Sequence, residues 1–487
     1  MAYALATRRR GLKVMVLRHV STRGEASGSG FADVLLAGLA RDGGLYVPEE
    51  WPKLALATIT GFAGRPYAEV ALEVIRLFTG EAIAAADLDR MVREAYGTFR
   101  HPAVVPLTQL DANTFALELF HGPTLAFKDV AMQLLARLMD HALAARGERR
   151  TIVVATSGDT GGAAVEAFGG RNQVDLIVLF PKGRVSDVQQ RLMTTASAGN
   201  IHALAIEGTF DDCHAIVKGM FNHAAFRDRV RLSGVNSINW ARIVAQTVYY
   251  FTAAVALGAP HRKVAFTVPT GNFGDIYAGY VAQCLGLPID RLLVATNVND
   301  ILSRTLATGT YELRAVVPTT SPSMDIQVSS NFERLLFDAY DRDAGVVRAL
   351  MGSLAQSGRF MLSAPALGRI RAVFSADRAD EEEVSATMRA VRRETGDFVD
   401  PHTAVGIAVA EKEQRDPALP MVVLSTAHPA KFPDAVEAAT GARPPLPDWL
   451  SDLNQRPQRM TVLPADQSAV EHFVLSTSRA AQEGAAA

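Results

Sequence analysis

Segments rich in aliphatic and β-branched residues recur from about residue 110 onward, and each leads through a polar or glycine-rich turn into a helical pattern. The clearest are TIVVATSGDTGGAAVEAF (151–168), KVAFTVPTGNFGDIYAGYVAQCL (263–285) and PMVVLSTAHPAKFPDAVEAA (420–439). Repeated strand-turn-helix units predict an α/β fold with parallel-rich sheets flanked by helices. Because ligands of such sheets bind beyond the carboxyl ends of the strands, we expect the functional residues in these turns.

The composition favours a small-molecule ligand over a nucleic acid or a membrane. The chain has 487 residues and a formal net charge of -2, and its longest basic tract is RRR at 8–10. No apolar run approaches the roughly 20 residues that a membrane-spanning helix needs. The two cysteines, Cys213 and Cys284, lack the spacing of a disulfide framework or a cysteine-based metal site. We therefore expect no metal and a reducing, cytoplasmic compartment.

The turn PTGNFGDIYAGY (269–280) follows the strand VAFTV and begins a helix. Gly271 and Gly274 allow the backbone to bend sharply and to approach a ligand, and the free N–H groups of a helix start attract phosphate. The spacing matches neither the Walker nor the dinucleotide fingerprint. Taken alone, the segment fits a structural turn as well as a phosphate site.

Two further turns carry small polar side chains. The run from Ser157 to Thr160 enters a helix, where its hydroxyl and carboxylate groups could contact a ligand or only cap the helix. In LSTAHPAKF (424–432), Thr426 follows a strand and can present its hydroxyl to a ligand. His428 is as well explained by a structural hydrogen bond as by catalysis.

Lys128 follows a Gly-Pro turn and begins a strongly apolar helical pattern. The positive end of a helix disfavours a cation, so the dipole and the apolar neighbours should lower the pKa of this lysine. A lowered pKa leaves a nucleophilic amine, which a lysine that bonds to an aldehyde needs, whereas an ordinary lysine only extends to solvent. An amine, a phosphate cradle and a hydroxyl for a ring nitrogen are the groups that hold pyridoxal phosphate.

Motifs with a fixed order run through most of the chain. They are STRGE (21–25), ARDGGLYVPE (40–49), FHGPTLAFKD (120–129), TSGDTGGAA (156–164), FPKGRVSDVQ (180–189), NSINWARI (236–243), PTGNFGD (269–275), MDIQVSSNFERL (324–335) and STAHPAKF (425–432). Together they resemble the motifs of threonine synthases of the longer bacterial and fungal type. The additional residues 1–14 are the main departure from that pattern.

The resemblance implies a fold type II pyridoxal-phosphate enzyme, similar to the tryptophan synthase β subunit, in which Lys128 is the catalytic lysine and bonds to the cofactor aldehyde. The implied cofactor-binding residues, besides Lys128, are Gly271, Asn272, Phe273, Gly274 and Asp275 for the phosphate, Thr426 for the pyridine nitrogen, and Ser157 and Asp159 beside the ring. The implied reaction converts O-phospho-L-homoserine and water to L-threonine and inorganic phosphate.

The implied substrate brings a second phosphate and a carboxylate, which need donors of their own. Arginine forks and small hydroxyls suit phosphate oxygens, although each such side chain could equally be an ordinary surface group. The candidates are Thr22, Arg23, Lys182, Arg184, Ser329, Ser330, Asn331 and Arg334 for the phosphate, and Ser157, Gly158, Asp159 and Thr160 for the carboxylate.

We expect a disordered extension (1–14), an N-terminal domain (15–100), a large cofactor-binding domain (101–150 and 236–450), a small α/β domain (151–235) and a C-terminal extension (451–487). The sequence leaves open whether the chain is a monomer or a homodimer. It also leaves alternative functions: a dehydratase or a β-replacement enzyme of the same fold type, which needs no second phosphate pocket, and a catalytically silent phosphate-binding relative.

Overall fold

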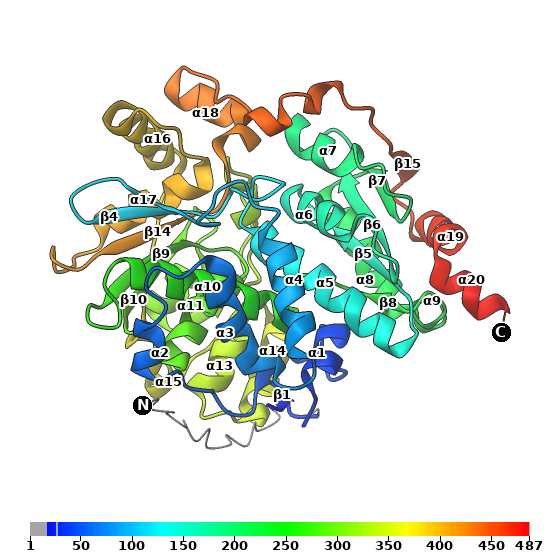
Figure 1. Ribbon diagram of the computed structural model, residues 1–487, viewed down its shortest axis with the longest axis horizontal. Coiled ribbons are helices and arrows are strands. Elements are labelled where there is room, and N and C mark those ends of the chain that lie inside the picture. Colours follow the sequence, from blue (N-terminus) through cyan, green and yellow to red (C-terminus); the bar gives the residue numbers. More distant parts are fainter. Residues whose placement is uncertain (1–16, 26–27, 487) are drawn as a thin grey trace, which may run out of the picture.

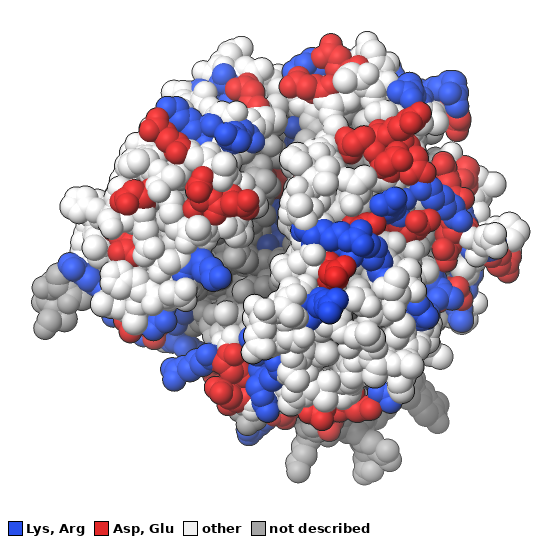
Figure 2. Space-filling model, turned by 180° about the vertical axis from the view of Figure 1, so that it is seen from behind, with Lys and Arg blue, Asp and Glu red and all other residues white. Residues whose placement is uncertain are grey.

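Two parallel-rich sheets and the helices around them form the body of the molecule (Figure 1). The computed structural model describes residues 17–25 and 28–486, so the predicted extension at 1–14 lies outside the described residues. Figure 2 shows the opposite face, where a groove runs between two lobes and basic and acidic side chains are interspersed. Such a mixed surface does not form the basic stripe typical of a nucleic-acid-binding protein.

The larger sheet has six strands in the order β13-β10-β9-β14-β4-β3, and its neighbours are parallel except for β3 and β4. All residues of β9 and of β14 are buried, because helices cover both faces of this sheet. The strands are β3 (Leu107–Gln109), β4 (Thr114–Glu118), β9 (Val264–Pro269), β10 (Ile289–Thr296), β13 (Phe374–Arg378) and β14 (Met421–Ser425).

The smaller sheet has five strands, all parallel, in the order β15-β7-β6-β5-β8. Its central strand β6 is buried at all eight positions. The strands are β5 (Arg150–Ala155), β6 (Val174–Pro181), β7 (Ile201–Glu207), β8 (Leu232–Ser233) and β15 (Thr461–Pro464).

The C-terminal residues 451–487, which were predicted as an extension, contribute a strand and helices that pack on the small sheet. Strand β15 pairs with β7 at the edge of the five-stranded sheet, and the helix α19 (Gln467–Thr477) packs against α8 (Phe210–Asn222). Strand β15 is short and mostly exposed, so it lacks the buried apolar run by which the other parallel strands can be detected. The last helix is α20 (Arg479–Ala486).

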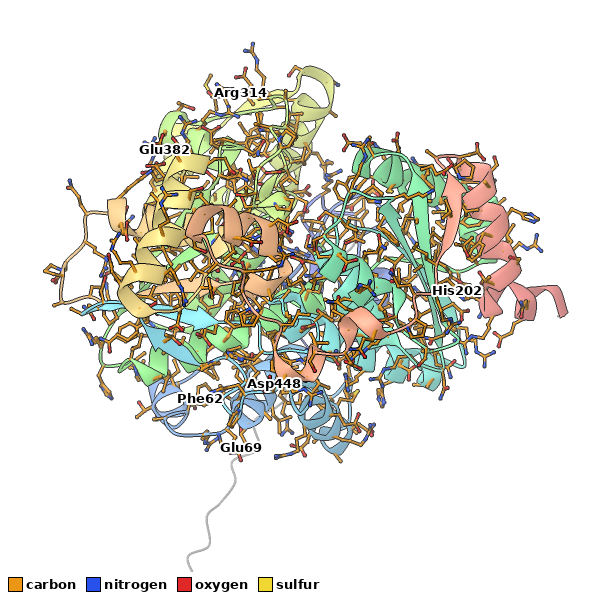
Figure 3. All side chains as sticks on the ribbon, turned by 90° about the horizontal axis from the view of Figure 1, so that it is seen from above. Phe62, Glu69, His202, Arg314, Glu382 and Asp448 are labelled. Atoms are coloured by element: carbon orange, nitrogen blue, oxygen red, sulfur yellow. The ribbon has the colours of Figure 1, made fainter. Side chains whose placement is uncertain are left out.

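Helix α5 (Lys128–Arg146) joins the two sheets. It packs against α6 (Asp159–Phe168), which follows the first strand of the small sheet, and against α10 (Trp240–Ala256), which covers the large sheet. A cluster of Leu125, Val188, Leu450 and Leu453 makes a second link. In Figure 3, Asp448 of this connecting segment lies between the part that carries Glu382 and the sheet that carries His202.

The N-terminal part packs on the helices α10 and α5 through amphipathic helices of its own, whose apolar faces are buried at helical spacing. Its elements are β1 (His19–Ser21), α1 (Phe31–Ala37), β2 (Tyr46–Pro48), α2 (Leu56–Thr60), α3 (Tyr67–Thr79) and α4 (Ala85–Tyr96). The strands β1 and β2 form an antiparallel pair.

Most of the remaining helices follow a strand, as the repeated sequence units predict, and three follow another helix. They are α7 (Asp187–Thr194), α9 (Ala224–Arg229), α11 (Gly274–Leu285), α12 (Ile301–Thr308), α13 (Phe332–Ala339), α14 (Ala344–Ser357), α15 (Ala364–Arg371), α16 (Glu381–Thr395), α17 (Pro401–Lys412) and α18 (Pro433–Thr440), with β11 (Thr310–Glu312), β12 (Arg359–Met361) and the 3-10 turns η1 (Pro322–Met324), η2 (Pro429–Lys431), η3 (Asp448–Leu450) and η4 (Leu453–Gln455). Among the described residues, the helices are too short or too polar to cross a membrane.

Candidate active site

The first residues of two packed helices meet between the sheets. Lys128 begins α5 and Asp159 begins α6, and their Nζ and Oδ2 atoms lie 3.4 Å apart. Burial lowers the pKa of Lys128, Asp159 opposes this effect, and the nearby cations Lys431 and Arg242 add to it. The predicted direction is therefore confirmed, although burial rather than the helix dipole is the largest cause.

Asp159 is held in its ionised form by several partners. Burial alone would raise the pKa of this carboxyl, but Lys431, Lys128 and His402 outweigh it and hold the pKa well below its ordinary value. The side chain of Gln189 donates to Oδ1 at 3.0 Å, and the hydroxyl of Ser323 lies 3.3 Å from Oδ2. The capping alternative does not apply to Asp159, since the N-terminal cap of α6 is Gly158 without a side-chain bond.

Lys431 is a second buried lysine, which the sequence analysis missed. Its Nζ lies 2.8 Å from Oδ1 of Asp159 and donates to the carbonyl of Thr124 at 2.9 Å. The motif STAHPAKF contains this residue, but nothing in its apolar neighbourhood distinguishes a buried lysine from an exposed one. Only the proximity of Lys431 to Asp159 in the fold identifies it as a site residue, and Asp159 follows a strand of the other sheet.

The turn before Lys128 is fixed to the turn after β14. The N–H of Phe127 donates to the carbonyl of Thr426 at 2.8 Å, and the N–H of His428 donates to the carbonyl of Leu125 at 3.0 Å. The hydroxyl of Thr426 bonds to no described residue, and the residue is 5% exposed. Thr426 is thus close to Lys128 in the fold and keeps its hydroxyl for a ligand.

His428 has a structural role in the turn after β14. Its Nδ1 accepts a hydrogen bond from the N–H of Ala430 and so caps the turn η2. Burial lowers the pKa of His428 to about 4, so its ring is neutral at neutral pH.

The glycine-rich turn after β9 forms an open cradle of backbone N–H groups. Those of Gly271, Asn272 and Phe273 donate to no acceptor within the described residues, and Phe273 has a left-handed φ of 66°. A Cβ at Gly271 would lie 2.8 Å from the carbonyl oxygen of Ser323, so the turn requires glycine there. Three free N–H groups before a helix suit a phosphate.

Two residues that were predicted to bind the substrate phosphate, Ser329 and Asn331, donate hydrogen bonds to the backbone of this turn. The hydroxyl of Ser329 donates to the carbonyl of Gly271 at 2.5 Å, and the backbone and side-chain N–H groups of Asn331 donate to the carbonyl of Asn272 at 3.0 and 3.2 Å. Ser330 is half-buried. The segment from Ser329 to Asn331 therefore lies against the cradle, and the hydrogen bonds of Ser329 and Asn331 hold the backbone of Gly271 and Asn272 in place.

Asp275 lies in the first turn of α11, directly after the cradle. Its Oδ1 accepts from the hydroxyl groups of Tyr249 and Tyr250, and its Oδ2 has no partner in the described part of the chain. Burial raises the pKa of Asp275 to about 7, because the tyrosine hydrogen bonds only partly compensate. A carboxyl that is partly neutral can lie near a phosphate with less repulsion.

Arg242 is a third buried cation beside Lys128 that the sequence analysis missed. It is 3% exposed, and its Nε has no partner among the described side chains and carbonyls. Burial lowers its pKa to about 10, so the guanidinium stays charged at neutral pH. The motif NSINWARI contains Arg242, but helical periodicity predicts only that one face of the segment is buried. A charged, incompletely bonded group in the interior is typical of a ligand site.

The other predicted donors of the substrate phosphate either bond to a protein carboxylate or are exposed on the surface. Thr22 and Arg23 both bond to Glu333, Arg23 through two nitrogens. Lys182 and Arg184 are exposed at the end of β6, where Lys182 pairs with Glu207.

Arg334 is a correction to the predicted set. It is fully buried, and all three of its nitrogens bond to protein oxygens, those of Tyr46, Ile238 and Asn331. The guanidinium also lies over the ring of Trp240. Each nitrogen of this buried guanidinium is therefore bonded within the protein, and Arg334 supports the structure.

The turn from Ser157 to Thr160 lies directly beside Asp159. The hydroxyl of Thr156 accepts from the N–H groups of Gly158 and Gly161, and Gly158 has a φ of 131° that a side chain would rarely adopt. Ser157 and Thr160 are half-buried. This turn can present its hydroxyl groups to a ligand next to Lys128.

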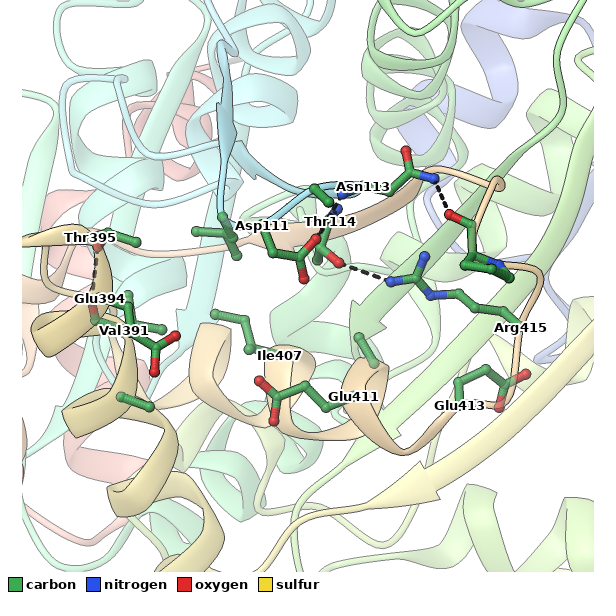
Figure 4. A pocket seen from close by; sticks show the side chains of 15 residues that line it. Asp111, Asn113, Thr114, Val391, Glu394, Thr395, Ile407, Glu411, Glu413 and Arg415 are labelled. Carbon is green, nitrogen blue, oxygen red and sulfur yellow. Dashed lines mark hydrogen bonds between the residues drawn. The ribbon is translucent and has the colours of Figure 1, made fainter.

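A separate hollow of about 550 Å³ lies between α16, α17 and the loop at 110–114 (Figure 4). Its lining includes Asp111, Glu394, Glu411, Glu413 and Arg415, and none of the predicted site residues. Carboxylates dominate it, which does not suit a phosphate-bearing ligand.

Family models match most of the chain. A model described as "Threonine synthase N terminus" matches residues 18–96, one described as "Pyridoxal-phosphate dependent enzyme" matches 100–350, and one described as "Threonine synthase, C-terminal" matches 403–474.

Known proteins give the same result along the whole chain. A threonine synthase of Pseudomonas aeruginosa is 52% identical, and the match covers 94% of this chain and 98% of that one. The crystal structure of a pyridoxal-phosphate-bound threonine synthase from Brucella melitensis is 63% identical with a TM-score of 0.93, and the match covers 95% and 100% of the two chains. The Escherichia coli threonine synthase structure is 32% identical with a TM-score of 0.79, covering 94% and 99%.

Proposed function

This chain belongs to the threonine synthase family, a family of pyridoxal-phosphate enzymes of fold type II, and on that premise we propose that it converts O-phospho-L-homoserine and water to L-threonine and inorganic phosphate. The observation that carries the proposal is the buried Lys128 amine in one region with the free N–H groups of Gly271, Asn272 and Phe273. Ser323 links the two, because its hydroxyl contacts Asp159, the partner of Lys128, and its carbonyl lies against Gly271. The amine can bond to the aldehyde of the cofactor, and the cradle of N–H groups can bind its phosphate.

The cofactor-binding residues in this proposal are Lys128, Gly271, Asn272, Phe273, Gly274, Asp275, Thr426, Ser157 and Asp159. Bound pyridoxal phosphate supplies an electron sink that stabilises negative charge on the substrate carbon atoms. A hydroxyl such as that of Thr426 does not hold the ring nitrogen protonated as a carboxylate does, so the sink is moderated and elimination is favoured.

Lys128 is the proton carrier of the proposed reaction. Burial is the largest cause that lowers the pKa of its amine, and the nearby cations Lys431 and Arg242 act in the same direction, which favours the neutral, basic form. The side chain is 8% exposed, which limits competition from water for the same protons. Because Lys128 lies in a rigid helix start that is bonded to the Thr426 turn, its Nζ is positioned for repeated transfers at neighbouring carbon atoms.

Arg242 is our candidate for the substrate phosphate, in addition to the predicted residues other than Arg334 and the exposed Lys182. It is a buried cation close enough to Lys128 to lower its pKa, and its Nε has no partner among the described groups. A planar guanidinium matches phosphate oxygens well. For the substrate carboxylate, the proposal keeps the turn of Ser157, Gly158, Asp159 and Thr160, whose half-buried hydroxyl groups lie beside Asp159.

The experiment compares the purified protein with Lys128→Ala and with Lys412→Ala, a control lysine that is exposed. Equal amounts of threonine and inorganic phosphate should form from O-phospho-L-homoserine with the wild type and the control, and neither product with Lys128→Ala. Turnover of serine or threonine but not of the phosphorylated substrate would instead establish the dehydratase or β-replacement alternative. A bound cofactor without any turnover would establish the silent relative.

The proposal places the enzyme in the cytoplasm as a monomer or homodimer, without a nucleic-acid or membrane partner. Both cysteines are free, as a reducing compartment allows, and the charges of the exposed face in Figure 2 are mixed in sign. Light scattering of the purified protein would distinguish the monomer from the homodimer.

A further inference from the structure

One carboxylate, that of Asp159, serves two lysines that come from different parts of the fold. Oδ1 lies 2.8 Å from Nζ of Lys431 in the turn η2, and Oδ2 lies 3.4 Å from Nζ of Lys128 in α5. Each oxygen therefore has its own ammonium neighbour, and the shorter contact belongs to the lysine that the proposed reaction does not use.

Asp159 is the counterion of Lys431. Its side chain is 1% exposed, and within the described residues Asp159 is its one carboxylate partner, next to the carbonyl of Thr124. Burying an ammonium group costs several kcal/mol unless it is paired and hydrogen-bonded. The pair of Lys431 and Asp159 therefore forms a fixed unit of zero net charge in the interior.

We propose that Lys431 is a positioning residue of the reaction, which acts as the permanent counterion of Asp159 and so keeps the Lys128 amine free to lose its proton. This inference rests on the proposed role of Lys128 as the cofactor-bonding and proton-carrying lysine. It follows from charge balance, because a protonated Lys128 would put a second positive charge on a carboxylate that is already neutralised.

The electrostatics around Lys128 have the signs that this role requires. The negative charge of Asp159 raises the pKa of Lys128, whereas the positive charge of Lys431 lowers it. Other charged or titratable groups also face these three residues. They are Asp129 of α5, Arg242 of α10, Asp275 of α11, Asp400 at the N-terminal cap of α17, His402 of α17, and His428 before η2. Lys128 and Lys431 are the ones that form ion pairs with Asp159 among the described residues.

A purely structural role for Lys431 is the alternative. Its backbone carbonyl accepts from the hydroxyl of Ser186 at 3.0 Å, so the segment also ties the turn after β14 to the start of α7. Removing the side chain could then loosen this link and lower the melting temperature. Such a loss would not by itself change the protonation of Lys128.

The test is a pH titration of the cofactor absorption band in the holoenzyme, because the band responds to protonation at the Lys128 nitrogen. In Lys431→Met, the midpoint should rise by about one to three pH units, since a positive charge near Lys128 is lost. The value of kcat at neutral pH should fall, whereas KM should change less. In Lys431→Arg, which retains the charge, the midpoint should stay near the wild-type value. If Lys431→Met does not fold, Lys431→Gln replaces it.

Two further variants make the result unambiguous. Asp159→Asn should move the midpoint in the opposite direction, because it removes the negative charge and leaves Lys431. Lys412→Met, at an exposed lysine paired with Glu383, should leave the midpoint unchanged. A normal band with an unchanged midpoint in Lys431→Met would overturn the role of Lys431 alone. A band that survives in Lys128→Ala would instead remove the premise about Lys128.

Discussion

Two lysine-carboxylate pairs in this molecule have nearly the same geometry and opposite surroundings. Lys431 lies 2.8 Å from Asp159 with side chains that are 1% and 4% exposed, and Lys182 lies 3.0 Å from Glu207 with side chains that are 50% and 56% exposed. Exposed pairs contribute about 0–1 kcal/mol, whereas removing one partner of a buried pair costs about 3–5 kcal/mol. Burial, and not the contact itself, separates the functional interior from the loop after β6.

The largest effect is expected at Arg242, a buried cation that forms no ion pair with a carboxylate of the described residues. Arg242→Ala should lower kcat/KM for O-phospho-L-homoserine by about 10²- to 10³-fold, because truncating a partner of a buried charge pair costs about 2–5 kcal/mol. Steady-state kinetics with the wild type and the variant measure the loss. The cofactor absorption band should persist, since the free N–H groups of the Gly271 turn do not depend on this side chain.

Arg262→Ala is the matched control, because Arg262 is exposed and bonds to the carbonyl of Ala418. It should change kcat/KM less than about twofold, as surface substitutions usually do. Loss of the cofactor together with activity in Arg242→Ala would show that Arg242 supports the cofactor pocket and does not act on the substrate phosphate.

The sequence predicts the elements of this site better than their environments. The parallel sheets follow from apolar runs such as VDLIVLFP, which is buried throughout, and the positions of Lys128 and of the Gly271 turn follow from their place at helix starts. Lys431 and Arg242 could not be recognised, because a charged residue inside an apolar segment gives no sign of which other segment supplies its partner. Arg334 was predicted as a phosphate donor because two of its three oxygen partners, the carbonyls of Tyr46 and Ile238, come from distant parts of the chain.

The buried carboxyl of Asp275, which forms no ion pair within the described residues, extends the comparison to the pH dependence of stability. Burial raises the pKa of Asp275 to about 7, above the value of 3.8 for an unfolded chain, so the folded state binds the extra proton between these values. Stability is then lost as the pH rises through this window, by about 1.4 kcal/mol between pH 6 and pH 8 for a single group.

Asp275→Asn should remove this contribution while the amide oxygen still accepts from Tyr249 and Tyr250. The drop in melting temperature between pH 6 and pH 8 should therefore be smaller in Asp275→Asn than in the wild type, as measured by circular dichroism at both pH values. Parallel drops in the two proteins would mean that Asp275 is ionised in the folded state throughout this range.

The smallest effect is expected at the exposed member of the comparison. Lys182→Ala removes an ion pair of nearly the same length as the one in the interior, yet both of its side chains lie in water in the wild type, where the attraction is weak and is screened by salt. We expect kcat/KM for O-phospho-L-homoserine to change less than about twofold and the melting temperature to stay within about 1 °C. The kinetics at low and at physiological salt provide the check, since a remaining surface contribution would shrink as salt is added. A rise in KM of tenfold or more would show that Lys182 reaches the substrate phosphate in the working enzyme, and that the exposed loop after β6 belongs to the site as much as the buried lysines do.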